Sequence, residues 1–205
     1  MITKNAIIVT NENQIPLKNF KNAFFIGVER GCFDLINKNI PVDLAIADFD
    51  HVSSEELEVI KSKANKIEIL NPEKDLIDGE VAILWAMKEG YSDILYLANP
   101  TIRHDMNLAS LNFAFKYGVR ILSDKSLILL LKKGKNIISF EKYQDYTYIS
   151  FVANCPTKVN IENLKYEAKN LSLEPYSLAA ISNCFVPYVD GAIESDEDIC
   201  MILTK

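Results

Sequence analysis

Five aspartates in the first half of the chain follow short apolar runs of strand length. They are Asp48, Asp50, Asp75, Asp78 and Asp105. If these runs are parallel strands, their carboxyl ends share one edge of a sheet, where open α/β folds bind ligands. Neighbouring carboxylates repel each other by about 1 kcal/mol per pair in water, so a cluster of them is expected to bind a divalent cation. Magnesium takes one or two carboxylates together with substrate phosphates, and the pattern therefore predicts a site for Mg²⁺ and a nucleotide.

Each motif also has a plainer interpretation. Asp48-Phe49-Asp50 puts two carboxylates on one side of a strand end, or it is an acidic turn before the next helix. Asp75 and Asp78 flank a helix start, where the helix dipole stabilises acids in any protein. Lys74 beside them could bind phosphate or be a solvated charge.

The motif Arg103-x-Asp105 follows another apolar run and leads into a helix. Arginine can grip phosphate oxygens with a planar fork, although a surface arginine beside a helix-start acid is the simpler interpretation. We expect His51 and His104, which neighbour these acids, to be solvated. Phosphates would be held by a cation, side chains and helix starts, because the chain has no Walker-type Gly-Lys-Ser/Thr loop and no Gly-x-Gly-x-x-Gly motif.

Composition narrows the class of partner. The 205 residues carry a net charge of −6, with a pI near 5.1. This charge argues against a nucleic-acid-binding protein, because binding to phosphates requires a surface rich in Lys and Arg. No apolar stretch reaches the roughly 18 residues that a membrane helix needs, and the amino terminus lacks the features of a signal peptide. We therefore expect a cytoplasmic protein with no membrane partner.

The first half alternates strand-like runs with helical patterns, which is typical of a mostly parallel α/β sheet. Ser53-Ser54-Glu55-Glu56 is a capping box that begins a helix. The predicted strands are 6–9, 23–28, 44–47, 66–70, 94–98 and 119–122, and the predicted helices are 53–62, 78–89 and 107–117.

The second half changes to short β-type runs, which predicts an all-β sandwich. The predicted strands are 127–131, 137–140, 146–152, 158–161, 177–181 and 199–204, with residues 132–135 as a hairpin connection. We expect an α/β nucleotide-binding catalytic domain over residues 1–124 and a β-sandwich domain over residues 125–205.

In order and spacing, these motifs resemble the thiamine pyrophosphokinase (thiamine diphosphokinase) family. The resemblance rests on Asp48-Phe49-Asp50, on Lys74-Asp75-Leu76-Ile77-Asp78-Gly79-Glu80-Val81-Ala82, on Arg103-His104-Asp105-Met106-Asn107-Leu108, on Asn163-Leu164-Lys165-Tyr166 and on Ser182-Asn183. It extends from about residue 24 to the carboxyl end. It implies transfer of a pyrophosphoryl group from Mg-ATP to thiamine, with release of AMP, by a homodimer whose active site lies at the subunit interface.

Residue by residue, the resemblance and the chemistry together suggest four roles. Metal ligands would be Asp48, Asp50, Asp75 and Asp78; nucleotide-binding residues Asp48, Lys74, Asp75, Arg103 and Asp105; catalytic residues Asp78, Asp50 and Arg103; and thiamine-binding residues Tyr166, Ser182 and Asn183. The sandwich domain would then bind thiamine, and Mg²⁺ and ATP would be cofactor and co-substrate.

The chain departs from the family's usual motifs at Glu29, Ala47, His51, Ile77, Thr101, Ile102 and Met106. Lost glycines restrict how closely backbone approaches phosphate. A non-catalytic relative that binds thiamine or a nucleotide is therefore an alternative. A Mg-dependent aspartyl phosphatase with Asp48 as nucleophile is a second one, although the β-rich second half fits it poorly.

Overall fold

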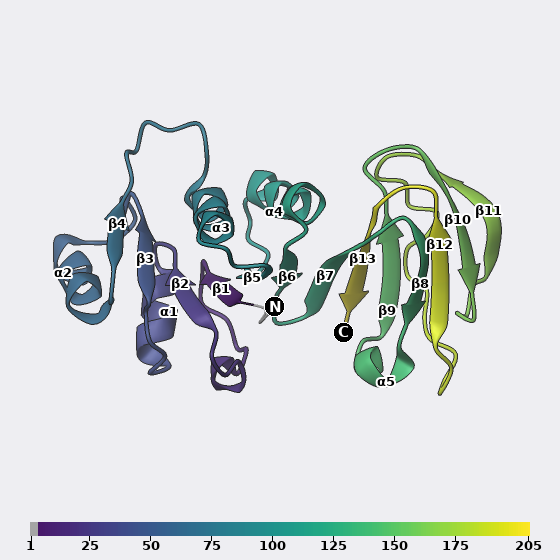
Figure 1. Ribbon diagram of the computed structural model, residues 1–205, viewed down its shortest axis with the longest axis horizontal. Coiled ribbons are helices and arrows are strands. Elements are labelled where there is room, and N and C mark those ends of the chain that lie inside the picture. Colours follow the sequence, from purple (N-terminus) through teal and green to yellow (C-terminus); the bar gives the residue numbers. More distant parts are fainter. Residues whose placement is uncertain (1–3) are drawn as a thin grey trace. The chain divides into compact units, whose positions relative to one another are not determined.

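The computed structural model describes residues 4–205, which form two compact units. The first unit comprises residues up to Asn107 together with Ile121–Asp124, and the second comprises Leu108–Arg120 and Lys125–Lys205. Figure 1 traces both along the chain. Most of helix α4 (His104–Tyr117) groups with the second unit, so a boundary at residues 124 and 125 stays a prediction.

The first unit is built on a sheet in the order β4-β3-β2-β1-β5-β6. The strands are β1 (Asn5–Val9), β2 (Phe24–Gly27), β3 (Leu44–Ala47), β4 (Ile67–Ile69), β5 (Asp93–Leu97) and β6 (Arg120–Leu122). Strand β1 pairs in parallel with both β2 and β5, and β3 pairs in parallel with β2 and β4. The chain order reverses between β1 and β5, and such a switch point is where open α/β sheets bind ligands.

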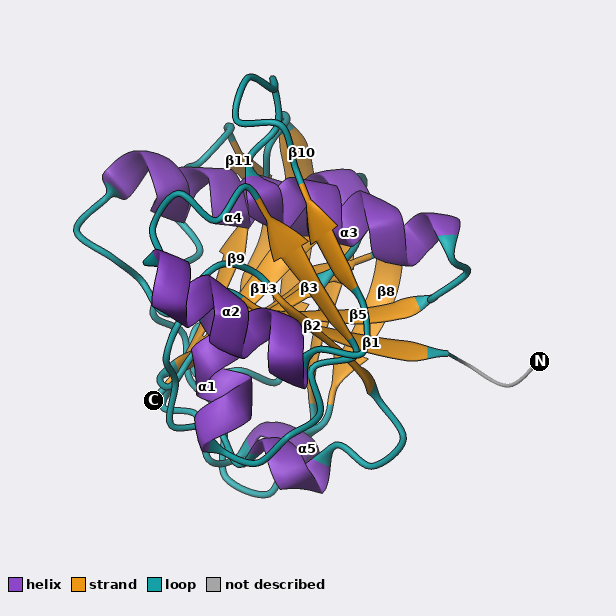
Figure 2. Ribbon diagram, turned by 90° about the vertical axis from the view of Figure 1, so that its left-hand side faces the viewer, coloured by secondary structure: helices purple, strands orange, loops and turns teal. Residues whose placement is uncertain are grey.

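Helices lie on both faces of this sheet, with α1 (Gly31–Asn37) and α2 (Ser54–Lys63) on one side and α3 (Asp78–Lys88) on the other (Figure 2). Strand β1 is apolar and buried from Ala6 to Val9, as expected for a parallel strand covered on both faces. Its alternate residues Ile7 and Val9 belong to the core cluster that contains Leu35 of α1 and Ile60 of α2. A short 3-10 helix spans Leu17–Asn19.

The capping box that was predicted for α2 is present. Ser53 Oγ accepts a hydrogen bond from the backbone N–H of Glu56 at 3.2 Å, and Glu56 Oε2 accepts one from the backbone N–H of Ser53 at 2.9 Å. Helix α1 was not predicted, because it is short and its N-cap Arg30 makes no side-chain capping bond.

The second unit is a sandwich of two antiparallel sheets, ordered β7-β13-β9 and β11-β10-β12-β8. Its elements are β7 (Ser126–Leu131), β8 (Gly134–Ile138), α5 (Phe140–Tyr143), β9 (Tyr148–Val152), β10 (Thr157–Glu162), β11 (Ala168–Leu173), β12 (Gly191–Ser195) and β13 (Ile199–Thr204). Buried side chains of both sheets, among them Phe151, Ile161, Ile193 and Leu203, form one core cluster. The expected fold class, a mostly parallel α/β sheet followed by a β-sandwich, is therefore confirmed.

Two local predictions in this unit are wrong. Residues 132–135 are not a hairpin connection, because β7 pairs with β13 whereas β8 pairs with β12 in the other sheet. Turn residues predict that the chain changes direction, but they do not predict which strand pairs with which. Residues 177–181 form turns instead of a strand, and strands β11 and β12 were not predicted. None of the helices formed by residues 4–205 is long and apolar enough to span a membrane.

Candidate active site

Three carboxylates converge at the carboxyl edge of the first unit's sheet. Glu29 follows β2, Asp48 follows β3, and Asp78 begins α3 after β4. One carboxylate oxygen from each residue lies within 4.8 Å of the other two. They meet because β2, β3 and β4 are neighbouring parallel strands, whose carboxyl ends share one edge.

Lys74 joins two of these acids. Its Nζ lies 3.0 Å from Asp48 Oδ2 and 2.7 Å from Asp78 Oδ1, and all three side chains are at most one-fifth exposed. Burial raises the pKa of Asp48, but the hydrogen bond and charge of Lys74 and the hydrogen bonds from Asp50 together outweigh burial and hold that pKa below its usual value. Burial alone would likewise lower the pKa of Lys74, and the bonds to Asp78 and Asp48 raise it instead. The lysine therefore favours the ionised form of Asp48.

Glu29 has no such partner. Both of its carboxylate oxygens are buried, and neither makes a hydrogen bond to any described residue. Burial raises the pKa of Glu29, the nearby backbone amide of Phe49 partly offsets the rise, and the charges of Asp78, Asp48 and Asp50 add to it. Its backbone is also left-handed, at φ 50°. A buried, unpartnered carboxylate held in a sparsely populated conformation is typical of a ligand-binding position.

Asp50 and His51 form a second group with Glu29, in which one donor atom from each residue lies within 4.8 Å of the others. Asp48 and Asp50 do not share a face of β3 as the strand alternation predicted. The strand ends at Ala47, and the buried Phe49 turns the backbone at φ 59°. The two aspartates consequently enter different groups.

The other predicted ligands lie apart from this cluster. Asp75 is exposed and belongs to neither group. Arg103 binds Asp105, with Nη2 2.6 Å from Oδ2, and this bond lowers the pKa of Asp105 to about 2. Both residues follow β5, and strands β1 and β2 lie between β5 and β3 in the sheet. Asp105 therefore does not reach the other acids. Their roles stay predictions.

Close packing fixes the start of α3. A Cβ at Gly79 would lie 2.2 Å from the hydroxyl oxygen of Tyr96 on β5, so only glycine fits between the first turn and this buried ring. Asp78 is the adjacent residue, so the same packing sets where its carboxylate lies.

In the second unit, the predicted thiamine-binding residues lie together. The Oδ1 atom of Asn183 accepts hydrogen bonds from the backbone N–H groups of Tyr166 and Cys184, at 3.0 and 2.9 Å. Its Nδ2 donates a hydrogen bond to the carbonyl oxygen of Tyr166 at 2.8 Å. Asn183 is 4% exposed, whereas Tyr166 is 57% exposed. Ser182 has a left-handed backbone and donates its N–H to Ser150 Oγ. Asn183 is thus occupied in holding the segment that presents Tyr166.

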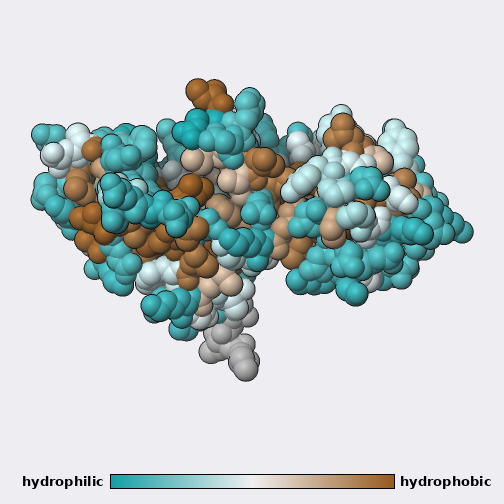
Figure 3. Space-filling model, turned by 90° about the horizontal axis from the view of Figure 1, so that it is seen from above, coloured by the Kyte–Doolittle hydropathy of each residue, from teal (hydrophilic) through white to brown (hydrophobic). Residues whose placement is uncertain are grey.

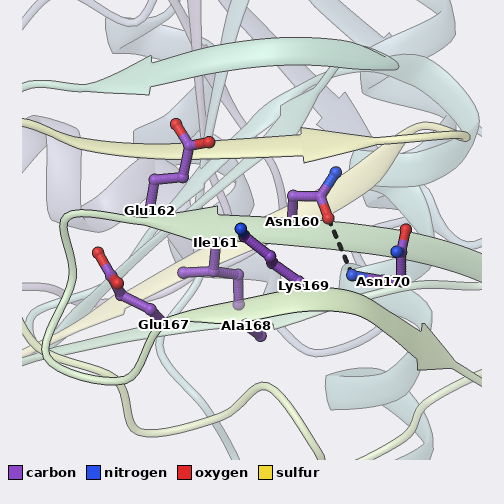
Figure 4. A pocket seen from close by; sticks show the side chains of 7 residues that line it. All are labelled: Asn160, Ile161, Glu162, Glu167, Ala168, Lys169 and Asn170. Carbon is purple, nitrogen blue, oxygen red and sulfur yellow. Dashed lines mark hydrogen bonds between the residues drawn. The ribbon is translucent and has the colours of Figure 1, made fainter.

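Exposed apolar side chains gather in the same part of the chain. They include Tyr176, Leu178, Ile181, Val186, Tyr188 and Val189. Figure 3 shows that apolar side chains interrupt the hydrophilic surface. A separate pocket of about 510 Å³ lies along β10 and β11, lined by polar side chains such as Asn160, Glu162 and Lys169 (Figure 4). None of the predicted site residues lines it.

The cluster in the first unit has the chemistry of a magnesium site. Magnesium prefers oxygen ligands and uses one or two carboxylates together with water and phosphate. Glu29, Asp48 and Asp78 supply carboxylate oxygens at a common position, and the two buried oxygens of Glu29 are without partners. The sequence analysis did not name Glu29 as a candidate ligand, although Glu29 follows the predicted strand 23–28 and the rule that identified Asp48 could have found it.

Comparisons with known proteins agree with this architecture. Residues 18–129 match the family model "Thiamin pyrophosphokinase, catalytic domain", and residues 135–200 match "Thiamin pyrophosphokinase, vitamin B1 binding domain". Thiamine pyrophosphokinase from Bacillus subtilis (strain 168) is 28% identical over 195 residues, covering 89% of each chain.

Solved structures show the same fold. A thiamin pyrophosphokinase family protein from Enterococcus faecalis superposes with a TM-score of 0.86 at 22% identity, covering 99% of each chain. The Bacillus subtilis enzyme superposes with a TM-score of 0.81 at 22% identity, covering 98% of this chain and 99% of that one. The two family models together cover most of the sequence, and the chain belongs to the thiamin pyrophosphokinase family.

Proposed function

We propose that this protein transfers a pyrophosphoryl group from Mg-ATP to the hydroxyl of thiamine, giving thiamine diphosphate and AMP. The observation that carries the proposal is the convergence of Glu29, Asp48 and Asp78 with both Glu29 oxygens buried and unpartnered. Membership of the thiamin pyrophosphokinase family supports the reaction class. The convergence of these three acids favours a catalyst over a non-catalytic relative, and family membership argues against the aspartyl-phosphatase interpretation.

In the first unit, the acidic side chains would bind the cation and the lysine would bind phosphate. Glu29, Asp48 and Asp78 would hold Mg²⁺, which when bound neutralises phosphate charge. Lys74 lies within ion-pair distance of two of these ligands, so its ammonium is available to a phosphate that approaches them. Pyrophosphoryl transfer depends mainly on positioning and on stabilising developing charge. Asp78 would also orient the thiamine hydroxyl or accept its proton.

Three predicted residues would complete the site when the nucleotide binds. Arg103 would exchange its exposed bond to Asp105 for the phosphates, since an exposed ion pair contributes little stability. Asp50, which is exposed beside Glu29, would take part in binding the cation. Asp75 would contact the nucleotide from its exposed position in the loop before α3.

The second unit would supply the thiamine pocket, in keeping with its match to a vitamin B1 binding domain. The exposed Tyr166 ring would stack on thiamine, a contact worth about 0.5 to 1.5 kcal/mol. Ser182 would line the same pocket, and Asn183 would hold Tyr166 in place. We infer a homodimer in which each site combines the first unit of one subunit with the second unit of its partner.

The test is direct. Purified full-length protein is incubated with thiamine, ATP and MgCl₂, and AMP and thiamine diphosphate are quantified by chromatography. Equal amounts of both products, absent without MgCl₂ and without thiamine, would support the proposal. Binding of thiamine or ATP by calorimetry without either product, across several divalent metals and nucleotides, would instead identify a non-catalytic relative.

A further inference from the structure

The loop that carries Arg103 is held at its base by a reciprocal pair of side chains. Asn99 Nδ2 donates a hydrogen bond to Asp124 Oδ2 at 2.9 Å, and Asn99 Oδ1 accepts one from the backbone N–H of Asp124 at 2.9 Å. Asp124 Oδ1 accepts a further bond from the backbone N–H of Gln14 at 2.7 Å. Asn99 follows β5 and Asp124 follows β6, so the pair joins the carboxyl ends of two neighbouring strands.

The segment after β1 holds the same base from the other side. Asn11 Oδ1 accepts a hydrogen bond from the backbone N–H of Asn99, and Asn11 Nδ2 donates one to the carbonyl oxygen of Asn99, both at 3.1 Å. Asn99 Nδ2 also donates to the carbonyl oxygen of Glu12 at 3.1 Å. The backbone and the side chain of Asn99 are therefore both fixed beside the β1–β5 switch point. Pro100 follows, and a proline restricts its own backbone and that of the residue before it.

The far end of the loop is held by a second asparagine. Asn107, near the start of α4, accepts a hydrogen bond from the backbone N–H of Thr101 at 3.0 Å and donates one to the carbonyl oxygen of Thr101 at 2.9 Å. Thr101 Oγ1 in turn accepts the backbone N–H of Arg103 at 3.0 Å. The family's usual motif has glycine near this position, and glycine has no side chain for such a bond. Side-chain bonds thus define the path of this loop as far as Arg103.

The side chain at the tip of the loop is exposed, in contrast to the base. The Arg103 side chain is 62% exposed and pairs with Asp105. A group on a loop that is already fixed loses less conformational freedom when it binds a ligand, and it meets the ligand in a defined orientation.

We propose that Asn99 and Asp124 are positioning residues, whose reciprocal bond fixes residues 99–103 so that Arg103 meets the polyphosphate in one orientation. This role deepens the proposed function and rests on it, because that function gives Arg103 its phosphate ligand.

Exchanging the amide and the carboxylate tests the pair. Asn99→Asp sets two carboxylates against each other, and Asp124→Asn sets two amide NH₂ groups against each other. The double variant Asn99→Asp/Asp124→Asn restores one donor facing one acceptor, in the reversed direction. The matched control is Asn65→Asp, because Asn65 Nδ2 donates to Asp43 Oδ1 at 3.1 Å. These two residues precede β4 and β3, so this second Asn–Asp pair lies at the opposite edge of the sheet.

Steady-state kinetics with Mg-ATP and thiamine, together with urea unfolding, compare the variants. We expect Asn99→Asp and Asp124→Asn each to lower kcat/KM for Mg-ATP by at least about tenfold, the scale of a misplaced catalytic group. The double variant should recover at least about threefold of that loss. Asn65→Asp should lower the urea midpoint yet keep kcat/KM within about twofold. Unchanged kcat/KM in both single variants, or a double variant no better than either, would overturn the proposal. Each single variant suffices if the other is too unstable to purify.

The Arg103→Ala background separates positioning from a merely structural role. In that background Asn99→Asp should lower kcat/KM by less than about twofold further, because the group that the loop positions is gone. Its effect on the urea midpoint should be the same in both backgrounds. An equal loss of kcat/KM with and without Arg103 would show that the pair acts through stability alone, which would also overturn the proposal.

Failure of this role is distinguishable from failure of the proposed function. If the wild type makes thiamine diphosphate and the single variants match it, the positioning role is wrong and the function stands. If the wild type makes no product, calorimetric titration with Mg-ATP makes the same comparison. A Mg-ATP affinity that falls in Asn99→Asp but not in Asn65→Asp would then support the positioning role while the proposed transfer is wrong. Equal affinity in all variants, or no Mg-ATP binding by the wild type, would overturn the positioning role.

Discussion

Glu29 is the residue at which binding and stability are most directly opposed. Its buried carboxylate has a pKa above the ordinary value of 4.5, first because of burial and then because of Asp78, Asp48 and Asp50. A carboxyl whose pKa is raised by folding binds its proton more tightly in the folded state. Ionised Glu29 therefore destabilises the metal-free protein at neutral pH, and this cost disappears as the pH falls below about 4.5.

We predict that Glu29→Gln stabilises the protein in EDTA at pH 7, by on the order of 1 kcal/mol, which corresponds to roughly 2 to 4 °C in melting temperature for a chain of this size. Thermal unfolding at pH 7 and at pH 4 measures the change, and the gain should vanish at the lower pH. Added MgCl₂ should then stabilise wild type more than the variant. A variant less stable than wild type at pH 7 in EDTA would contradict the assignment.

Asp78 and Asp75 are three positions apart and carry the same group, yet their environments differ. Asp78 lies in the cluster beside Lys74, whereas Asp75 is exposed outside it. We predict that Asp78→Asn lowers kcat/KM by at least about a hundredfold, the scale of losing one charged contact in a reactive site. Asp75→Asn should lose less than about tenfold, because its side chain approaches the nucleotide from solvent. Steady-state kinetics on the two variants compare them, and equal losses would return Asp75 to the metal shell.

At the scale of elements, the first turn of α3 depends on its fit against β5. We predict that Gly79→Ala lowers the free energy of unfolding by about 1 to 3 kcal/mol, the usual cost of overpacking, because the added Cβ meets the Tyr96 hydroxyl at 2.2 Å. In a Tyr96→Phe background the loss should shrink, since the oxygen is gone and ring carbons remain at 3.1 Å. Urea unfolding of both single variants and the double variant measures the coupling. The same penalty in both backgrounds would show that Tyr96 does not limit this helix.

Asn183 joins two loops of the sandwich. We predict that Asn183→Ala costs about 1 to 3 kcal/mol of stability, because the backbone N–H and carbonyl of Tyr166 lose their partner. The KM for thiamine should rise more than kcat falls, since the chemistry lies in the other unit. Ser182→Ala is the control, because its hydrogen bond to Ser150 uses the backbone N–H. Its unfolding free energy should change by less than about 0.5 kcal/mol, and an equal loss in both variants would remove the special role of Asn183.

Patterns contained within one element were readable from the sequence. The capping box of α2 lies within four consecutive residues, and most strands of the first unit are short, mainly apolar runs. Features that depend on a distant partner were not readable. The order β4-β3-β2-β1-β5 separates Asp105 from the acids, and the antiparallel partner of β7 is β13, more than 60 residues away. Glu29 lay between these cases, because its position after a predicted strand was visible but its burial was not.

At the scale of the whole molecule, the proposed homodimer makes a prediction that a one-chain site does not. We mix equal amounts of Asp78→Asn subunits, which are nearly inactive alone, and Tyr166→Ala subunits, which lose about two- to twelvefold at low thiamine concentration, the range set by one stacking contact. If each site combines the first unit of one subunit with the second unit of its partner, every mixed dimer has one intact site. Statistical exchange then restores about a quarter of wild-type activity, because half of the dimers are mixed.

The control for this experiment mixes Asp78→Asn with the double variant Asp78→Asn/Tyr166→Ala, which cannot make an intact site. Sedimentation before and after mixing verifies that dimers form and exchange. A mixture that exchanges fully yet stays at the activity of the separate variants would place both residues of each site in one chain.

The bridge from Lys74 to Asp48 and Asp78 bears on how ligand arrives. The single ammonium offsets half of the charge of these two carboxylates at short range, so an arriving cation meets a partly neutralised site instead of two bare negative charges. In the proposed reaction, Mg²⁺ bound by Asp48 and Asp78 would replace the ammonium as their counter-ion, and Lys74 would then be available to pair with the phosphates. The net electrostatic gain from cation binding would then be smaller than at a site without the lysine, because one ion pair is lost as another forms.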